Sequence, residues 1–258
     1  MFQEERINAI MEHLNQHKRI DIKDMCQKFD VSRDTARRDL LRMEELGLIL
    51  RTHGGAVLPK KSREVFEYKD RLVKDSDVKR DIGRLAASLV KDGDYIMMDA
   101  STTVQFTAEH LTAERVVAVT NSIDIADALS RKNAVRTYLL GGELNIKHRF
   151  LFGQATIDNL ADYQVDKLFL GACGITANGL SYPDVEDGVV KREMIKKANQ
   201  VILLADHTKF GEQMFYKIGG LDAIDLLITD QQPDRDMMEK LAEHHVELRV
   251  VSEEDLDD

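Results

Sequence analysis

The chain has 258 residues, of which 43% are hydrophobic and 32% are charged, and its formal net charge is −10. This length suits one large domain with a smaller one, and the acidic balance excludes a protein that coats nucleic acid along its whole length. Because the sequence has no run of about 18 apolar residues and begins with a charged, helix-periodic stretch, we expect neither a membrane span nor a signal peptide, and therefore a cytoplasmic protein.

The two cysteines are consistent with a reducing compartment. Cys26 and Cys173 fall in different proposed domains, and neither has a second cysteine or a histidine at the spacing of metal ligands. We interpret both as small apolar residues, and we expect no bound metal and no cofactor.

Basic side chains are concentrated near the N-terminus. Residues 1–61 contain 12 Lys and Arg against 10 Asp and Glu, which is a surplus of two positive charges in a chain of net charge −10. A segment of this size and charge is typical of a small DNA-binding domain.

Three helices are expected in this segment. Apolar residues at positions 7, 10, 11 and 14 follow the spacing of one helical face. Asp21 is placed to cap a second helix at about residues 22–29, and Ser32 is placed to cap a third, which we expect to end at Gly47. Three helices with a tight break between the second and the third are typical of a helix-turn-helix.

The third helix separates apolar residues from arginines. Positions 36, 40 and 43 form a narrow apolar stripe, and Arg38, flanked by Arg37 and Arg42, projects nearly opposite to it. A helix packed through this stripe presents its arginines outward, toward phosphates and guanine edges. The alternative is an ordinary solvated face, on which Asp34 pairs with Arg38. Asp39 would likewise pair with Arg42.

A basic β-hairpin is expected after the third helix. Residues 46–57 read LGLILRTHGGAV, with a β-like apolar run, Arg51 and His53 near the tip, and a turn at Gly54 and Gly55. This is the pattern of a wing. The helix cap, the tight turn and the wing together favour a DNA-binding role for the arginines over an ordinary solvated face. The side chains expected to contact double-stranded operator DNA are Ser32, Arg33, Thr35, Arg37, Arg38, Arg42, Arg51 and His53.

The rest of the chain predicts an α/β domain. We place the winged helix-turn-helix at residues 1–57, a charged connector that can be partly helical at 58–76, and the larger domain at 77–258. A helical face begins at residue 82, and apolar strands are expected at 95–98, 116–119, 135–140, 167–170, 201–205, 224–228 and 246–251. Helical segments separate most of them, for example 123–131, 187–199 and 234–243. This alternation predicts a mostly parallel sheet with helices on both faces.

Polar and glycine-rich segments follow several of these strands at their carboxyl ends, where α/β sheets bind ligands. A hydroxyl-rich turn that opens a helix suits a phosphate, glycines permit close backbone approach, and a lysine can neutralise the charge. The residues expected to bind an anionic effector are Asp99, Ser101, Thr102, Thr103, Asn121, Gly141, Gly142, Gly171 and Lys209. Each segment alone could also be an ordinary cap or turn, and we interpret His207 and His148 as loop residues.

Two groups of motifs resemble the DeoR family of bacterial transcriptional repressors. The first is VSRDTARRDL with the following GLILRTHGGA, which resembles the winged helix-turn-helix of that family. The second resembles its effector domain and comprises DASTT at 99–103, TNS at 120–122, LGACGI at 170–175 and DHTKFG at 206–211. The resemblance implies a larger domain similar to ribose-5-phosphate isomerase and glucosamine-6-phosphate deaminase. It also implies a repressor of a carbohydrate catabolic operon that releases its operator when a phosphorylated sugar binds.

Catalysis is the main alternative to binding. In the isomerases that the effector domain resembles, an aspartate-rich segment follows the fourth strand, whereas here that segment is Gly171 to Gly174 and contains no carboxylate. Glu193 could correspond to the glutamate of the isomerases, but a lone glutamate on a helix is ordinarily a surface residue. We therefore expect no enzyme and no catalytic residue. A sugar-phosphate isomerase with a DNA-binding appendage and a pure protein-interaction module remain as alternatives.

An oligomer is expected. A single small winged module buries too little surface to hold an operator alone, so we expect a homodimer or homotetramer that reads half-sites about one helical turn apart or at a multiple of it. No membrane partner is expected.

Overall fold

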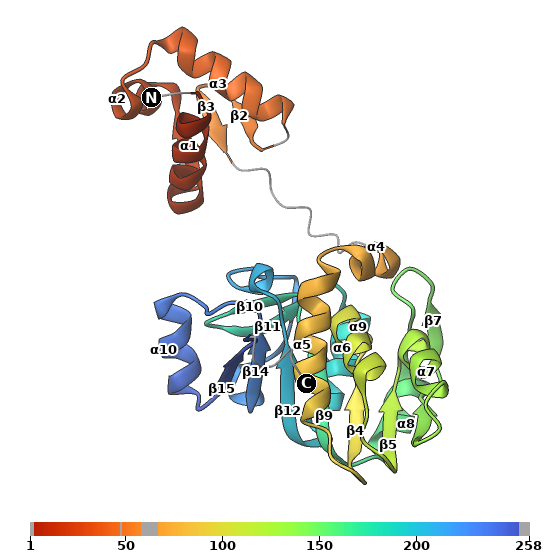
Figure 1. Cartoon of the computed structure of the whole chain (residues 1–258). Coiled ribbons are helices and arrows are strands. Elements are labelled where there is room, and N and C mark those ends of the chain that lie inside the picture. The colour runs from red at the N-terminus through yellow and green to blue at the C-terminus, as the bar shows by residue number, and fades with distance from the viewer. Residues whose placement is uncertain (1–2, 47, 58–66, 253–258) are drawn as a thin grey trace. The chain divides into compact units, whose positions relative to one another are not determined.

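The computed structural model describes residues 3–46, 48–57 and 67–252, and it divides the chain into two compact units, Met1–Arg63 and Glu64–Asp258 (Figure 1). The expected helix cap at Gly47 and residues 58–66 of the expected connector lie outside the described residues.

The N-terminal unit has three helices and a small antiparallel sheet. The helices are α1 (Gln3–His17), α2 (Ile22–Phe29) and α3 (Arg33–Glu45), and the strands, in the order β1-β3-β2, are β1 (Arg19–Asp21), β3 (Gly55–Val57) and β2 (Leu50–Thr52). The three predicted helices and the hairpin of the wing are confirmed, whereas β1 was not predicted. The turn is at His53 and Gly54, and Gly55 already belongs to β3. A Cβ at Gly55 would overlap the carbonyl oxygen of Ile20, so glycine permits the close pairing of β1 with β3.

The two predicted helix caps explain where α2 and α3 begin. The side chain of Asp21 accepts a hydrogen bond from the backbone N–H of Asp24 at 3.2 Å, and Ser32 accepts one from the N–H of Thr35 at 3.2 Å. The apolar stripe of α3 is buried, and it packs in one core with Ile10 and Leu14 of α1 and with Met25 of α2.

The alternative pairing of Asp39 with Arg42 requires Asp39 to lie on the solvated face of α3, and this interpretation is wrong. Its side chain is 1% exposed and accepts hydrogen bonds from Arg6 on α1, from Nε at 2.6 Å and from one terminal nitrogen at 3.1 Å. Gln3 donates a third at 3.0 Å. The aspartate therefore joins α1 to α3 inside the unit.

The C-terminal unit is built on a seven-stranded, all-parallel sheet. In the order along the sheet, its strands are β15 (Glu247–Val250), β14 (Leu226–Thr229), β12 (Ala198–Leu204), β9 (Val165–Gly171), β4 (Tyr95–Met98), β5 (Val116–Thr120) and β6 (Val135–Leu139). Each of the seven corresponds to a predicted strand, so the parallel α/β architecture is confirmed.

Helices cover both faces of this sheet. On one face lie α5 (Ser76–Ser88), α6 (Thr102–His110) and α7 (Ile123–Ser130), and on the other α8 (Gln154–Ala161), α9 (Val185–Ile195) and α10 (Arg235–Glu243). Side chains alternate between the two cores, so that Met97 packs on one face while its neighbours Ile96 and Met98 pack on the other. The helix predicted at 187–199 is shorter than expected, because Ala198 already pairs with Val165 as the first residue of β12.

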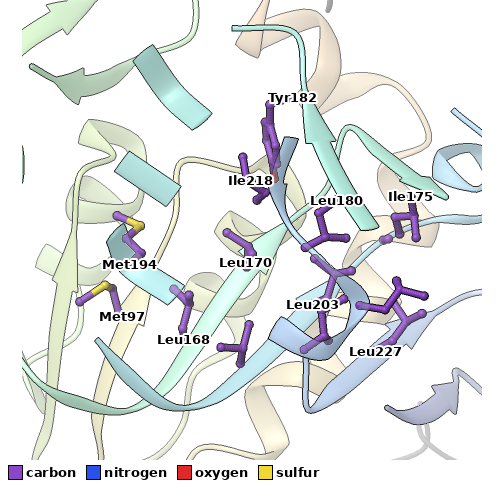
Figure 2. Close-up of a cluster of buried hydrophobic side chains, with 14 of the residues drawn as sticks. Met97, Leu168, Leu170, Ile175, Leu180, Tyr182, Met194, Leu203, Ile218 and Leu227 are labelled. Atoms are coloured by element: carbon purple, nitrogen blue, oxygen red, sulfur yellow. The ribbon is translucent and has the colours of Figure 1, made fainter. Parts of the chain in front are cut away.

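A small sheet covers part of one face. Its strands are β10 (Gly174–Thr176), β11 (Gly179–Tyr182) and β13 (Tyr216–Gly219), and a separate hairpin is formed by β7 (Glu143–Asn145) and β8 (Phe150–Phe152). Figure 2 shows Leu180 and Ile175 of the small sheet packed toward Leu203 of the main sheet. Neither of these additions was predicted.

The helix α4 (Tyr68–Val73) lies within the range expected to be a connector. Tyr68 is 1% exposed, its hydroxyl donates to Oε1 of Gln105 on α6 at 2.6 Å, and its N–H donates to the carbonyl of Lys147 at 3.1 Å. Burial raises the pKa of this phenol far above its usual range, so it is neutral. This part of the range therefore packs as a helix of the C-terminal unit.

Candidate functional site

The outward face of α3 carries four arginines, Arg33, Arg37, Arg38 and Arg42, and all four are exposed. At the start of the helix the hydroxyls of Ser32 and Thr35 lie 2.9 Å apart. The buried stripe fixes which way this face points, because the helix packs through it on α1 and α2.

The contacts of these arginines within the unit are weak. Arg37 lies 3.8 Å from Asp34, Arg42 lies 3.5 Å from Glu45, and Nε of Arg38 lies 3.4 Å from the backbone carbonyl of Asp34. Exposed pairs of this kind contribute about 0–1 kcal/mol, so phosphate oxygens can replace them at little cost.

The wing lies beside α3. Arg51 on β2 is 3.8 Å from Glu44 on α3, and His53 is exposed in the turn that joins β2 to β3. The structure thus brings the expected DNA contacts of helix and wing together in one unit.

The second candidate site lies where the strand order of the main sheet reverses. β4 is followed along the sheet by β5 and β6 on one side, while β9, β12, β14 and β15 extend on the other. Ligands of open α/β sheets bind at such a point, at the carboxyl ends of the strands. A cavity of about 30 Å³ lies there, lined by Arg71, Ala100, Ser101, His148, Phe150, Gly171, Ala172, Cys173, Tyr182, Pro183, Asp184, Asp187 and Lys191.

A buried ionic cluster lies at this cavity, and two of its members, Asp187 and Lys191, belong to the lining, whereas Asp99 does not. The ammonium of Lys191 on α9 donates to Oδ2 of Asp99, which follows β4, and lies 3.3 Å from Oδ1 of Asp187, one turn earlier on α9. The ring of Tyr182 lies 4.8 Å from the same ammonium. Among the described residues, Oδ1 of Asp99 and Oδ1 of Asp187 are buried without a hydrogen bond.

One ammonium shared by two carboxylates sets the protonation of the cluster. Burial opposes the charged form of Lys191, but the charges of Asp187 and Asp99 outweigh it and hold the lysine pKa above its usual value. Burial raises the pKa of Asp187, and the charge of Lys191 only partly offsets this effect. The lysine is therefore cationic, and Asp187 in the lining offers a carboxylate oxygen that can accept a hydrogen bond from a ligand.

Ser101 and Gly171 form the part of the cavity closest to the sheet. Gly171 ends β9, and a Cβ at this position would overlap the side chain of Ser101, so glycine is needed for the two strand ends to approach. Ser101 precedes α6 but makes no capping hydrogen bond through its side chain within the described part of the chain. The side chain of Ser101 thus leaves the N–H groups of the first turn of α6 uncapped.

The other expected effector residues do not line the cavity. Thr102 and Thr103 are buried in the first turn of α6. Asn121 is 1% exposed, and its Nδ2 donates to the carbonyl of Leu151 at 3.0 Å. The remaining three residues are Gly141, Gly142 and Lys209.

Two of these three have contacts of their own. The carbonyl of Gly141, after β6, accepts from Thr156 at 2.7 Å. The ammonium of Lys209 lies 3.3 Å from Asp206. Burial acts to raise the pKa of Asp206, but Lys209 and hydrogen bonds from Thr208 hold it below its usual value.

Several lining residues were not predicted, above all Arg71, Tyr182, Asp187 and Lys191. The segment after the fourth predicted strand contains no carboxylate, but the cavity does have one in its lining, because Asp187 of α9 lies there. Glu193 does not line the cavity, and it accepts a hydrogen bond from Lys196 at 2.6 Å.

A wider hollow of about 530 Å³ lies between β10 and α10. Its lining includes the carboxylates of Asp234, Asp236 and Glu239 and only one cation, Lys240, which disfavours an anionic ligand. Within residues 3–46, 48–57 and 67–252, no group of three or more His, Cys, Asp or Glu side chains is arranged to hold a metal ion. No helix of the same ranges is long and apolar enough to cross a membrane.

Both units match family models. The model described as DeoR-like helix-turn-helix domain matches residues 6–62, and the one described as DeoR C terminal sensor domain matches residues 74–231. The chain is 49% identical over 255 residues to the HTH-type transcriptional repressor GlcR of Bacillus subtilis, a match that covers 99% of each chain. It is 33% identical over 252 residues to the glycerol-3-phosphate regulon repressor of Escherichia coli, which covers 97% of this chain and 100% of that one.

Among solved structures, ribose 5 phosphate isomerase A from Neisseria gonorrhoeae is 17% identical, with a TM-score of 0.38, and the match covers 51% of this chain and 52% of the isomerase. The two family models and the identity to whole curated relatives confirm the resemblance seen in the sequence: the chain belongs to the DeoR family of helix-turn-helix transcriptional regulators.

Proposed function

We propose that this protein represses a carbohydrate catabolic operon, and that a phosphorylated sugar bound in the cavity between β4 and β9 changes its affinity for operator DNA. The relatives support the class of function, since they are named a transcriptional repressor and a glycerol-3-phosphate regulon repressor. The observation that carries the DNA-binding half is the exposed arginine face of a capped α3 with the wing beside it.

DNA would be read by α3 in the major groove. The arginines at 33, 37, 38 and 42 reach phosphates and base edges, while Ser32 and Thr35 at the helix start and the wing residues Arg51 and His53 position the unit on the backbone. Their weak contacts within the protein leave them available for this exchange.

The effector would lie with its two chemical ends at different parts of the cavity. The first turn of α6, with Ser101 and the expected residues Thr102 and Thr103, suits a phosphate because its N–H groups and the helix dipole favour an anion. Asp187, which lines the cavity and whose Oδ1 accepts no hydrogen bond from the described residues, suits a hydroxyl group, which donates one. A sugar phosphate carries both groups, whereas inorganic phosphate carries only the first.

We propose a homodimer or homotetramer in the bacterial cytoplasm. Two recognition helices on half-sites about 34 Å apart, or at a multiple of that spacing, supply the contact area that one winged unit lacks. The expected sign of the effector is release of the operator, as in the family that the sequence resembles.

Arg38→Ala tests the DNA-binding half. One arginine that contacts DNA contributes about 1–3 kcal/mol, so in an oligomer the variant should lose more than tenfold in operator affinity at moderate salt. The measurement is an electrophoretic mobility shift with the promoter DNA of the gene next to this one. The matched control is Arg235→Ala on α10, whose side chain is 89% exposed. Operator affinity retained by Arg38→Ala would contradict the assignment of α3 as the recognition helix.

The second candidate function is sugar-phosphate isomerisation, because Asp187 places a carboxyl group of raised pKa in the cavity. We propose that it serves binding and that the protein has no turnover, since the ammonium of Lys191 lies between the two carboxylates. Incubation of the full chain with ribose 5-phosphate or fructose 6-phosphate, followed by a coupled assay for the isomer, should show no product. Measurable turnover would favour the enzyme.

A further inference from the structure

Arg71 on α4 brings a cation to the cavity, where its guanidinium lies 5.4 Å from the centroid of the Tyr68 ring but has no anionic partner among the described residues. Its side chain lines the cavity, its Nε is buried without a hydrogen bond, and no carboxylate of the described residues lies within ion-pair distance of it. The other cation of the lining, Lys191, is already paired with Asp99 and Asp187. A partly buried guanidinium without an anion is costly, and an anionic ligand removes that cost.

The helix α4 has few attachments to the rest of its unit. Its six residues include one buried side chain, Tyr68, whose backbone and hydroxyl contact the β7–β8 turn and α6. The ammonium of Lys79 on α5 donates to the carbonyls of Arg71 and Lys74 and so holds the end of the helix. In contrast, the walls supplied by β4, β9 and α9 carry many buried side chains.

The cavity is small for a sugar phosphate. Its volume is about 30 Å³, whereas pockets for small ligands hold roughly 300 Å³ or more, so a ligand enters more easily if one wall shifts. Among the described elements that line it, α4 and β8 have one buried side chain each, but β8 is also held by its pairing with β7 and by the bridge of Phe150 to Ser122. The wall that can shift as a ligand enters is therefore α4.

We propose that Arg71 binds the anionic group of the effector and that α4, by moving with Arg71, conveys occupancy of the cavity to the DNA-binding unit. The proposal rests on the proposed function, since it takes the phosphorylated sugar as the ligand. Along the chain, α4 is the first described element after β3 of the N-terminal unit. We take the effector to bind better when α4 has shifted. If the effector then changes the affinity for the operator by some factor, the operator must change the affinity for the effector by the same factor.

The test compares the full-length wild type with Arg71→Ala, Arg71→Lys and, as a matched control on the same helix, Lys69→Ala, whose side chain is exposed. The probes are glucose 6-phosphate, fructose 6-phosphate, glycerol 3-phosphate and inorganic phosphate, with glucose as the uncharged counterpart. Thermal shift on the wild type selects the probe, and calorimetric titration then gives its dissociation constant for each variant. We expect Arg71→Ala to bind it about 10- to 100-fold more weakly and Lys69→Ala to match the wild type. Arg71→Lys should lie between them, because it keeps the charge but loses the planar fork.

The second readout is the ratio of operator dissociation constants with and without the probe, measured at a concentration that saturates each variant. Wild type and Lys69→Ala should show the full ratio, whereas Arg71→Ala should show a smaller one even at saturation.

The outcomes separate the two proposals. A wild type that responds to none of the phosphorylated probes contradicts the proposed effector. A wild type that responds while Arg71→Ala binds equally well, or regains the full operator ratio at saturation, contradicts the role of Arg71 and α4 alone. If Arg71→Ala has a lowered melting temperature without ligand, the comparison is made with Arg71→Lys.

Discussion

The thiol of Cys173 reports on the environment of the cavity, because it lies in the wall and burial raises its pKa to about 11. A raised pKa keeps the thiol protonated at neutral pH, and only the thiolate is alkylated. At pH 8 the thiolate fraction is about one in a thousand, and it rises roughly tenfold per pH unit up to the pKa. Iodoacetamide should therefore modify Cys173 about 100-fold more slowly in the folded protein than in urea, which mass spectrometry can follow with Cys173→Ser to assign the site. Equal rates in the two states would contradict this environment.

The same scale shows which site residues a sequence can reveal. Ser101 and Gly171, which line the cavity, and Asp99, which contacts Lys191 of its lining, were predicted because each lies at the end of an apolar strand, and strand ends gather at one edge of a parallel sheet. Lys191 and Asp187 lie one turn apart on a helix, a spacing that looks the same for an exposed salt bridge and for the buried cluster observed here. Only packing on the sheet distinguishes the two cases.

At the scale of elements, the contact of Arg6 with Asp39 holds α1 against α3. Hydrogen bonding to Asp39 raises the pKa of Arg6, so the arginine stays charged. Asp39→Ala breaks this buried ion pair, which should lower the free energy of unfolding of the N-terminal unit by about 3–5 kcal/mol. Urea unfolding followed by circular dichroism measures the change. Asp34→Ala, which removes an exposed carboxylate 3.8 Å from Arg37 on the same helix, should cost less than about 1 kcal/mol. A similar loss in both variants would mean that the buried pair has no special role.

Elements with a long apolar run or a clear cap were predictable, and shorter ones were not. The inner strands of the main sheet were found because most of their side chains are buried on both faces, which gives continuous apolar runs. The edge strands β6 and β15 are more exposed and show only short apolar stretches. Strands of three residues such as β1, β7 and β10 are too short to show alternation, and they form because a partner strand lies beside them. The helix α4 was not predicted either, because one buried side chain among six residues, three of them charged, gives no helical periodicity.

At the scale of the whole molecule, the chain contains separate hydrophobic cores. The core of the N-terminal unit is formed within residues 7–56, whereas the two cores of the C-terminal unit are formed by residues on either face of the main sheet. Units with their own cores can unfold independently, and the enthalpy of each transition follows the size of its unit. We therefore expect calorimetry of the full chain to show a smaller and a larger transition.

Each ligand should then stabilise the unit that binds it. A phosphorylated sugar at 100 times its dissociation constant adds about 2.7 kcal/mol to the larger unit, which should raise that transition by roughly 5–10 °C. Operator DNA should raise the smaller transition, because the expected DNA contacts all lie in the N-terminal unit. With both ligands present, each shift should be smaller than with one ligand alone, since an effector that releases the operator must bind the DNA complex more weakly. A single transition that both ligands raise by the same amount would mean that the two units unfold as one, and that the coupling between sugar and operator does not pass between independent domains.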